Sequence, residues 1–168
     1  MKSLITILST LTIVGLIVGS FIQAANTATI TATVTVQNVS LSVSDGSITY
    51  GTLAQNSSKS TCDLSDTQTV TNNGNVAETF NIKGQDSANW TLGTTPGTNV
   101  YVHKFSTSTC GSINWNTAPT LATSTYATMA TNVATSSNVT LNLQITTPNP
   151  STSFDPQSVD VTVQAVAY

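Results

Sequence analysis

Residues 27–44 read TATITATVTVQNVSLSVS, and their apolar positions change parity halfway along. The even set is Ile30, Ala32, Val34 and Val36, and the odd set that follows it is Val39, Leu41 and Val43. Successive side chains of a strand point to opposite faces, so one regular strand cannot place both sets on the same face. The pattern therefore breaks at Gln37 and Asn38.

Two arrangements explain this break. A β-bulge at Gln37 and Asn38 re-aims one continuous strand within its own domain. Alternatively, residues 27–36 form a separate strand that need not pair with the domain carrying it. In that case they act as a donor strand: their even set enters an apolar groove on a neighbouring copy, and main-chain hydrogen bonds supply much of the affinity. Head-to-tail exchange that does not close on itself generates a filament.

The N-terminus reads as a secretory signal, with Lys2 before an apolar run over residues 4–22 and a cleavage site at Ala24. A retained pilin-type helix is the alternative, because the run of about 19 apolar and small residues approaches the roughly 20 that span a bilayer. We expect a signal peptide at residues 1–24, an N-terminal donor strand at 25–37 and a β-sandwich domain at 38–168. The expected location is secreted, extracellular or at the cell surface.

The composition excludes one class of partner and favours one class of fold. Charged residues make up 7% of the chain, arginine is absent, and the net charge is −3. Nucleic-acid binding requires clustered Lys and Arg, so nucleic acid is not expected as a partner. The abundant Thr and Val are strand-forming residues, which is typical of an extracellular β-protein.

The chain has two cysteines, Cys62 and Cys110, which predict a single disulfide in a secreted protein. The bridge would close a loop of roughly 49 residues and stabilise the fold by about 4 kcal/mol in the chain-entropy model. A metal site or a catalytic thiol is disfavoured, because there is no CxxC motif and the single histidine, His103, has no acid beside it in sequence.

Turn signals and alternation predict an all-β domain. Asp45-Gly46 and Asn73-Gly74 each predict a two-residue hairpin between the strands that flank them. The expected strands are residues 39–44, 47–50, 67–72, 76–83, 99–106, 138–146 and 157–167, with a short strand at Trp90 and Leu92. The sequence thus predicts about eight to ten short strands after the signal peptide, a number typical of a β-sandwich. No helix is expected among them. The fold class is therefore an antiparallel β-sandwich of jelly-roll or Ig-like type, preceded by an N-terminal hydrophobic signal helix, and a closed barrel is the lesser alternative.

Several stretches resemble a known family of fibre-forming proteins. They are Gly51-Thr52-Leu53 before a polar loop, TVTNNGN at 69–75 leading into FNIK at 80–83, and QSVDVTVQA at 157–165 as the last strand. The chain thereby resembles the TasA and camelysin family of secreted matrix proteins and the archaeal bundling pilins related to it. The resemblance implies a jelly-roll domain that polymerises when the N-terminal strand of one subunit completes the sheet of the next.

Sequons mark four candidate glycosylation sites, Asn56, Asn38, Asn138 and Asn89. A chain this rich in Asn, Ser and Thr contains such motifs by chance, so they carry little information. Asn56 lies in a polar loop and is the most credible acceptor.

No catalytic or metal-binding signature is present. His103 lacks a Ser-containing elbow motif or a paired acid, so we do not expect an enzyme. Asp63, Asp66 and Asp86 lack EF-hand spacing, and neither a metal nor a cofactor is expected. Four aromatic residues are either an exposed sugar-binding platform or, more commonly, anchors in the core: Trp90, Trp115, Tyr101 and Tyr126.

The sequence as a whole predicts a structural subunit of an extracellular filament, pilus or matrix fibre that assembles by donor-strand exchange. Its expected partner is itself, as a homopolymer, with cell-surface or matrix components as further partners. The alternatives are a monomeric cell-surface adhesin or carbohydrate-binding β-sandwich module, in which residues 27–36 pair within their own domain, and a pilin with a retained N-terminal helix.

Overall fold

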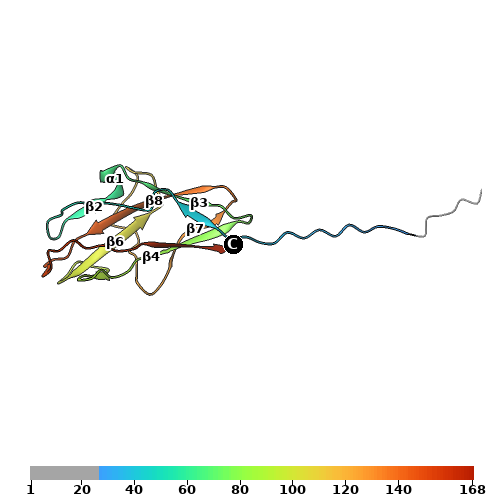
Figure 1. Ribbon diagram of the computed structural model, residues 1–168. Helices are drawn as coiled ribbons and strands as arrows, with labels where there is room; N and C mark the ends of the chain where they lie inside the picture. The colour runs from blue at the N-terminus through green and yellow to red at the C-terminus, as the bar shows by residue number, and fades with distance from the viewer. Residues whose placement is uncertain (1–26) are drawn as a thin grey trace, which may run out of the picture. The chain divides into compact units, whose positions relative to one another are not determined.

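The computed structural model describes residues 27–168, so the expected signal peptide at 1–24 lies outside the described residues. Residues 27–35 are exposed and contain neither helix nor strand, and the unit Val36–Tyr168 carries all the strands (Figure 1). Within the described part of the chain, no helix is both long and apolar enough to cross a membrane.

The strands form two sheets that pack into a β-sandwich (Figure 1). The larger sheet has six strands in the order β1-β3-β8-β6-β5, with β2 also paired to β8, and the smaller has the order β7-β4-β9. The six-stranded sheet contains β1 (Leu41–Val43), β2 (Ser58–Ser60), β3 (Gln68–Asn72), β5 (Thr91–Gly93), β6 (Val100–Ser106) and β8 (Asn138–Thr146). The three-stranded sheet contains β4 (Glu78–Lys83), β7 (Ala127–Val133) and β9 (Thr162–Ala167). All pairs are antiparallel except β5 with β6.

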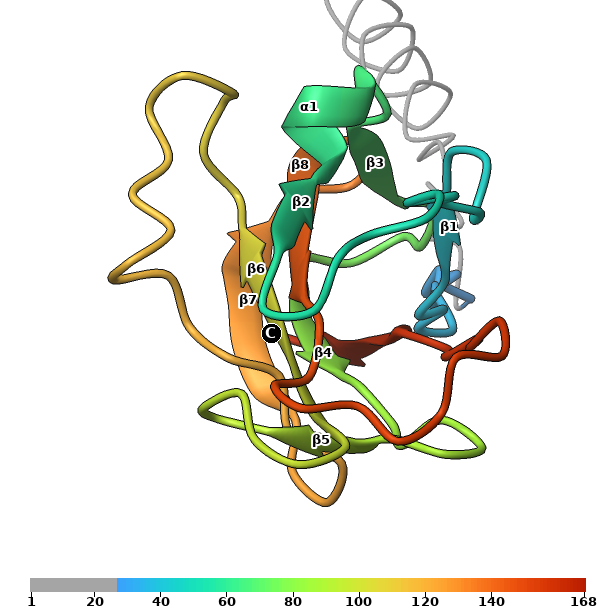
Figure 2. The same ribbon diagram turned by 90° about the vertical axis from the view of Figure 1, so that its left-hand side faces the viewer.

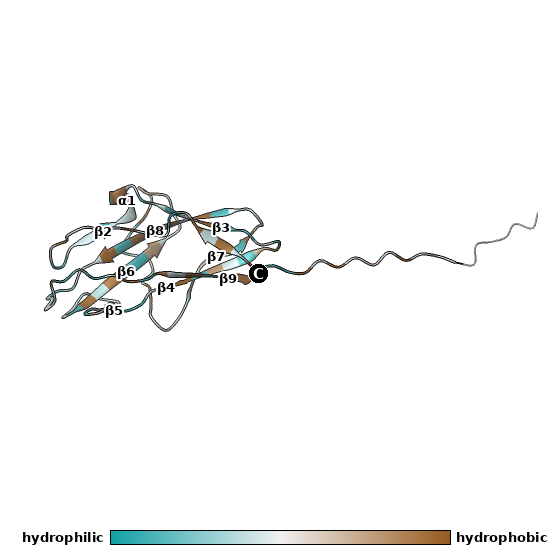
Figure 3. Cartoon of the chain, in the orientation of Figure 1, coloured by the Kyte–Doolittle hydropathy of each residue, from teal (hydrophilic) through white to brown (hydrophobic). Residues whose placement is uncertain are grey.

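The core lies between the two sheets. The larger sheet contributes Val70, Phe105, Leu141 and Leu143, and the smaller sheet contributes Phe80, Ile82, Met129 and Val133. Hydrophobic and hydrophilic residues alternate along β8 (Figure 3), because side chains of a strand point to its two faces in turn. Leu121, from the long connection between β6 and β7, joins the same cluster.

Strands with strong alternation form where the sequence predicts them. The strand predicted at 138–146 is confirmed residue for residue as β8, and the one predicted at 99–106 becomes β6. Tyr101, Val102 and His103 are all buried, as expected for a strand that is covered on both sides. In β4, Phe80 and Ile82 face the core as the alternation predicts.

Both predicted hairpins are wrong. Ser44 and Asp45 do form a bend, and Gly46 after them has a φ of 71°, but β1 pairs with β3 and residues 47–50 form no strand. The strands on either side of Asn73-Gly74 belong to different sheets. The reason is that β3 and β4 each carry a dry face, and these faces meet across the core instead of lying side by side.

The expectation that no helix follows the signal is also wrong. The short helix α1 (Thr61–Leu64) separates β2 from β3, which lie along the same edge of β8 (Figure 2). Ser60 caps this helix: its side chain accepts a hydrogen bond from the Asp63 amide, and the Asp63 carboxylate accepts one from the Ser60 amide. This capping box, readable as S-x-x-D, is the signal that sequence reasoning missed.

The ends of the smaller sheet also differ from the prediction. β7 forms in a region of Thr and Ala, where the apolar alternation is too weak to reveal a strand. The last strand was predicted from residue 157, but only Thr162–Ala167 pairs with β4. Residues 157–161 instead lie beside a groove.

Candidate assembly site

The two sheets are unequal in width, and a groove results. The three-stranded sheet ends at β9, which pairs with β4 along one edge and with no other described strand. Beside it, the inner face of the larger sheet opens into a cavity of about 590 Å³, which we call the β9 groove. Its apolar lining consists of Val43, Ile48, Leu141, Leu143, Ile145, Val159, Val161 and Val163. The segment leading to β9 contributes residues 157–161 to this lining, and it is drawn in dark red in Figure 2.

A second hollow of about 650 Å³ continues the β9 groove, because both are lined by Ile48, Tyr50, Ile145 and Gln157. Trp90 and Phe154 line this extension, and 80% of the Phe154 surface is exposed. The sandwich therefore carries an elongated apolar depression along one open side.

The strand at this open side is only partly covered. Val161, Val163 and Ala165 pack against the core cluster, yet each remains partly exposed. The outer edge of β9 also leaves main-chain N–H and C=O groups available for pairing. One further strand beside β9 would cover these side chains and use these groups.

The candidate donor strand has exposed apolar side chains. Those of Ile30, Val34 and Val36 are 92%, 91% and 81% exposed. Ala32, the fourth member of the set, is exposed as well. The bulge alternative needs one strand running through residues 27–44, whereas only Leu41–Val43 of this stretch is strand.

A buried histidine and a half-buried tyrosine form a polar pair in the groove lining. The Tyr50 hydroxyl lies 3.1 Å from Nε2 of His103, and the two rings meet edge to face. Nδ1 of His103 is buried and has no partner among the described residues. Burial lowers the pKa of His103 to about 4, so the ring is neutral at pH 7, and burial also raises the pKa of Tyr50. Asp160 is the one lining residue with a charged side chain, which suits an uncharged occupant.

The buried His103 predicts a loss of stability in acid. Because its pKa is depressed in the folded protein, the unfolded chain binds the extra proton below about pH 6.5 and the folded chain does not until about pH 4. The free energy of unfolding should fall by roughly 3 kcal/mol between pH 7 and pH 4 from this group alone. Urea denaturation of wild type and His103→Gln across this range measures the effect, and equal pH slopes for the two proteins would contradict it.

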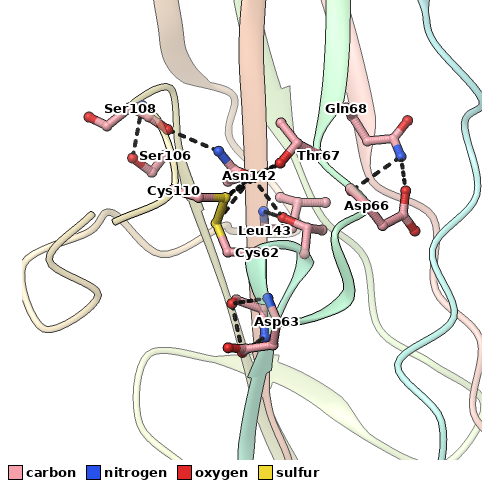
Figure 4. Close-up of a disulfide and its surroundings, with 12 residues drawn as sticks. Cys62, Asp63, Asp66, Thr67, Gln68, Ser106, Ser108, Cys110, Asn142 and Leu143 are labelled. Atoms are coloured by element: carbon pink, nitrogen blue, oxygen red, sulfur yellow. Dashed lines mark hydrogen bonds between the residues drawn. A yellow bond between two sulfur atoms is a disulfide. The ribbon is translucent and has the colours of Figure 1, made fainter. Parts of the chain in front are cut away.

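The disulfide predicted between Cys62 and Cys110 is confirmed (Figure 4). It joins α1 to the long connection that follows β6, across a sequence separation of 48 residues. The bond is consistent with folding in an oxidising compartment.

Asn142 organises the surroundings of the disulfide (Figure 4). Although it lies on β8 between two core leucines, its side chain is fully buried beside the bridge. Its Oδ1 accepts hydrogen bonds from the hydroxyls of Thr61 and Thr67, and its Nδ2 donates one to the Ser108 carbonyl. Sequence reasoning missed Asn142 because a polar residue between two apolar ones normally faces water.

The remaining candidate residues do not form a common site. The sequon residues are all exposed: Asn38, Asn56, Asn89 and Asn138. Asp63 completes the capping box of α1, and the hydrogen bond from the Ser60 hydroxyl holds the pKa of its carboxyl below the usual range. Asp66 and Asp86 each accept a hydrogen bond from a residue close in sequence, and residues 27–168 contain no group of three side chains able to hold a metal ion.

The four aromatic residues do not form one exposed platform, because Tyr101 is completely buried. Trp90 packs on Tyr101 with ring centroids 6.4 Å apart, and Trp115 is partly buried. Tyr126 is 38% exposed and lies under the Lys83 ammonium group. Two of the four thus anchor one end of the sandwich.

The fold and the bridge define a disulfide-bonded β-sandwich protein with an open apolar groove. Comparisons with protein-family models, with curated proteins and with solved structures find no match to this chain. The resemblance to the TasA and camelysin family stays a prediction.

Proposed function

We propose that this protein is the structural subunit of an extracellular filament or matrix fibre, and that residues 27–36 of one copy occupy the β9 groove of the next. The observation that carries the proposal is that one chain holds both halves of a contact: an exposed segment with alternating apolar residues that forms no strand of its own, and an apolar groove beside a free strand edge. The disulfide supports a secreted, extracellular location.

The dimensions of donor and acceptor agree. Ten extended residues span about 33 Å, and residues 157–167, which run along the groove into β9, span about 36 Å when extended. Pairing with β9 points the even set of the donor into the groove, and its threonines at odd positions then face outward. The sandwich is in this proposal an incomplete jelly roll that a neighbour's strand completes.

The chemistry of the contact is also consistent. Residues 27–36 carry no charge, and half of the residues that line the groove are aliphatic. Burial of the four aliphatic side chains contributes roughly 4 to 8 kcal/mol. Association costs are of similar size, so stable contacts also need the main-chain bonds of the new ladder, at about 0.5 to 1.5 kcal/mol each. A donor strand paired with β9 along its whole length would supply both the buried side chains and the main-chain hydrogen bonds.

A pair of adjacent substitutions tests the proposal. Val34→Asp places a charge on the face that enters the groove, and Thr33→Asp places the same charge on the outer face. Both positions are exposed in the free subunit, so effects on solubility and net charge are matched. Val34→Asp should raise the concentration needed for filament formation at least about 100-fold, because an unpaired charge would be buried, and Thr33→Asp should change it little.

Sedimentation and electron microscopy of the full mature chain measure this difference. Equal assembly by the two variants would contradict strand donation. A monomer in all three proteins, wild type included, would favour the surface adhesin or carbohydrate-binding module instead.

A further inference from the structure

The chain that follows the donor strand is held to the sandwich by Asn75. Its side-chain Nδ2 donates to the Val36 carbonyl and its Oδ1 accepts from the Asn38 amide, each at 2.8 Å. The main-chain amide of Asn75 donates in turn to the Asn38 carbonyl at 3.1 Å. One residue thus makes three hydrogen bonds across the position where the apolar pattern changes parity.

These hydrogen bonds lie next to the β1–β3 pair, just beyond the point where its regular main-chain pairing ends. β1 pairs with β3 up to Leu41 and Asn72, and the Asn73 amide then donates to the Ser40 carbonyl. Beyond that point the side chain of Asn75 takes the place of the main chain as the partner of residues 36–38. Residues 36–40 are therefore held beside this turn without belonging to a strand.

Two neighbours allow the chain to lie this close. A Cβ atom on Gly74 would stand 2.5 Å from the Asn38 carbonyl oxygen, so a side chain here would displace the segment. Glu78 is completely buried, and its Oε1 accepts from the Ser40 amide at 2.8 Å. The turn between β3 and β4 therefore holds residues 36–40 in place. We call this set of contacts, made by Gly74, Asn75 and Glu78, the Asn75 clamp.

We propose that Asn75 is a positioning residue for assembly, which fixes the start of the donor strand so that residues 27–36 reach a neighbour in one register. This inference rests on the proposed function and adds a residue that lies outside the groove and reaches the donor strand only at the Val36 carbonyl. Without the clamp, residues 36–40 become free, and ordering them on assembly costs conformational entropy.

The test compares Asn75→Ala with Asn73→Ala in the full mature chain. Asn73 lies in the same turn, and its side chain makes one exposed hydrogen bond, to the Ser42 hydroxyl, so the control removes a similar contact away from the clamp. Asn75→Ala should raise the concentration needed for filament formation at least about tenfold, because several residues lose their order. Asn73→Ala should assemble as wild type does.

A second readout separates positioning from a general loss of structure. The β9 groove of Asn75→Ala remains intact, so this variant still accepts a donor strand while donating its own poorly. Small amounts of it should therefore shorten wild-type filaments, whereas an unfolded subunit would leave them unchanged. Asn75→Asp keeps an oxygen that accepts from the Asn38 amide but loses the N–H group that donates to the Val36 carbonyl. It should therefore shorten wild-type filaments less than Asn75→Ala does.

The possible failures are distinguishable. Assembly of Asn75→Ala at the wild-type concentration, while Val34→Asp does not assemble, overturns the clamp and leaves the proposed function standing. Equal assembly of Val34→Asp and Thr33→Asp overturns the proposed function, and the clamp with it.

Discussion

Replacing Cys62 and Cys110 with alanine is expected to lower the free energy of unfolding by about 4 kcal/mol. The bridge spans 48 residues of sequence, and removing it restores the freedom of that loop in the unfolded chain. Domains of this kind are stable by about 5 to 15 kcal/mol, so the bridge supplies a large share of the total. Urea denaturation followed by circular dichroism measures the loss.

Reduction provides the matched control for this variant. A reducing agent should destabilise the wild type by the same amount and leave the double alanine variant unchanged. The hydrogen bonds of Asn142 to Thr61 and Thr67 do not depend on the bridge, so α1 should keep its place in the folded state. A loss of less than 1 kcal/mol, roughly a quarter of the loop-closure value, would contradict this account of the disulfide.

The strands of the core could be predicted because their pattern is local. β8 alternates over nine residues, β4 has Phe80 and Ile82 on one face, and the two cysteines allow a single pairing. Each of these signals is contained in a short stretch or a simple count. The positions of β4, β6 and β8 and the disulfide therefore follow from the sequence alone.

The sheet partners could not be predicted in the same way. Asp45-Gly46 and Asn73-Gly74 have the residues of hairpin turns, but a turn signal reports the bend and not the strand that lies alongside. β1 finds its partner in β3, and β4 finds its partners in β7 and β9, which are distant in sequence. Which strands pair is determined by how the apolar faces of the two sheets pack together in the core, and this packing involves the whole chain.

Of the two halves of the candidate site, the donor segment could be predicted from the sequence and the β9 groove could not. The donor segment is visible as a change of parity at Gln37 and Asn38. The β9 groove arises because the two sheets differ in width, and no single stretch of sequence contains that information. Asn75 likewise looks like an ordinary turn residue until its hydrogen bonds to Val36 and Asn38 are seen.

The second large effect is expected from deletion of residues 27–36. The core cluster and every strand of the described residues lie within Val36–Tyr168, so the shortened chain should fold with nearly unchanged stability. It should keep an empty β9 groove and have nothing to donate, and filament formation should therefore be abolished. It should also bind to the ends of wild-type filaments, because its groove can accept a donor strand.

The same deletion distinguishes donation from internal pairing. If residues 27–36 completed their own sandwich, their removal would expose the apolar face of Val161 and Val163 and destabilise the monomer. Under strand donation the monomer already has that face partly exposed, and the deletion changes assembly without changing folding. Urea denaturation of both chains at low concentration measures this difference.

The most direct test is electron microscopy with size-exclusion chromatography on the chain expressed from Ala25, with and without residues 27–36. Strand donation predicts filaments from the complete mature chain and a folded, monodisperse monomer from the shortened one. Filaments from both chains, or a monomer from both, would contradict it.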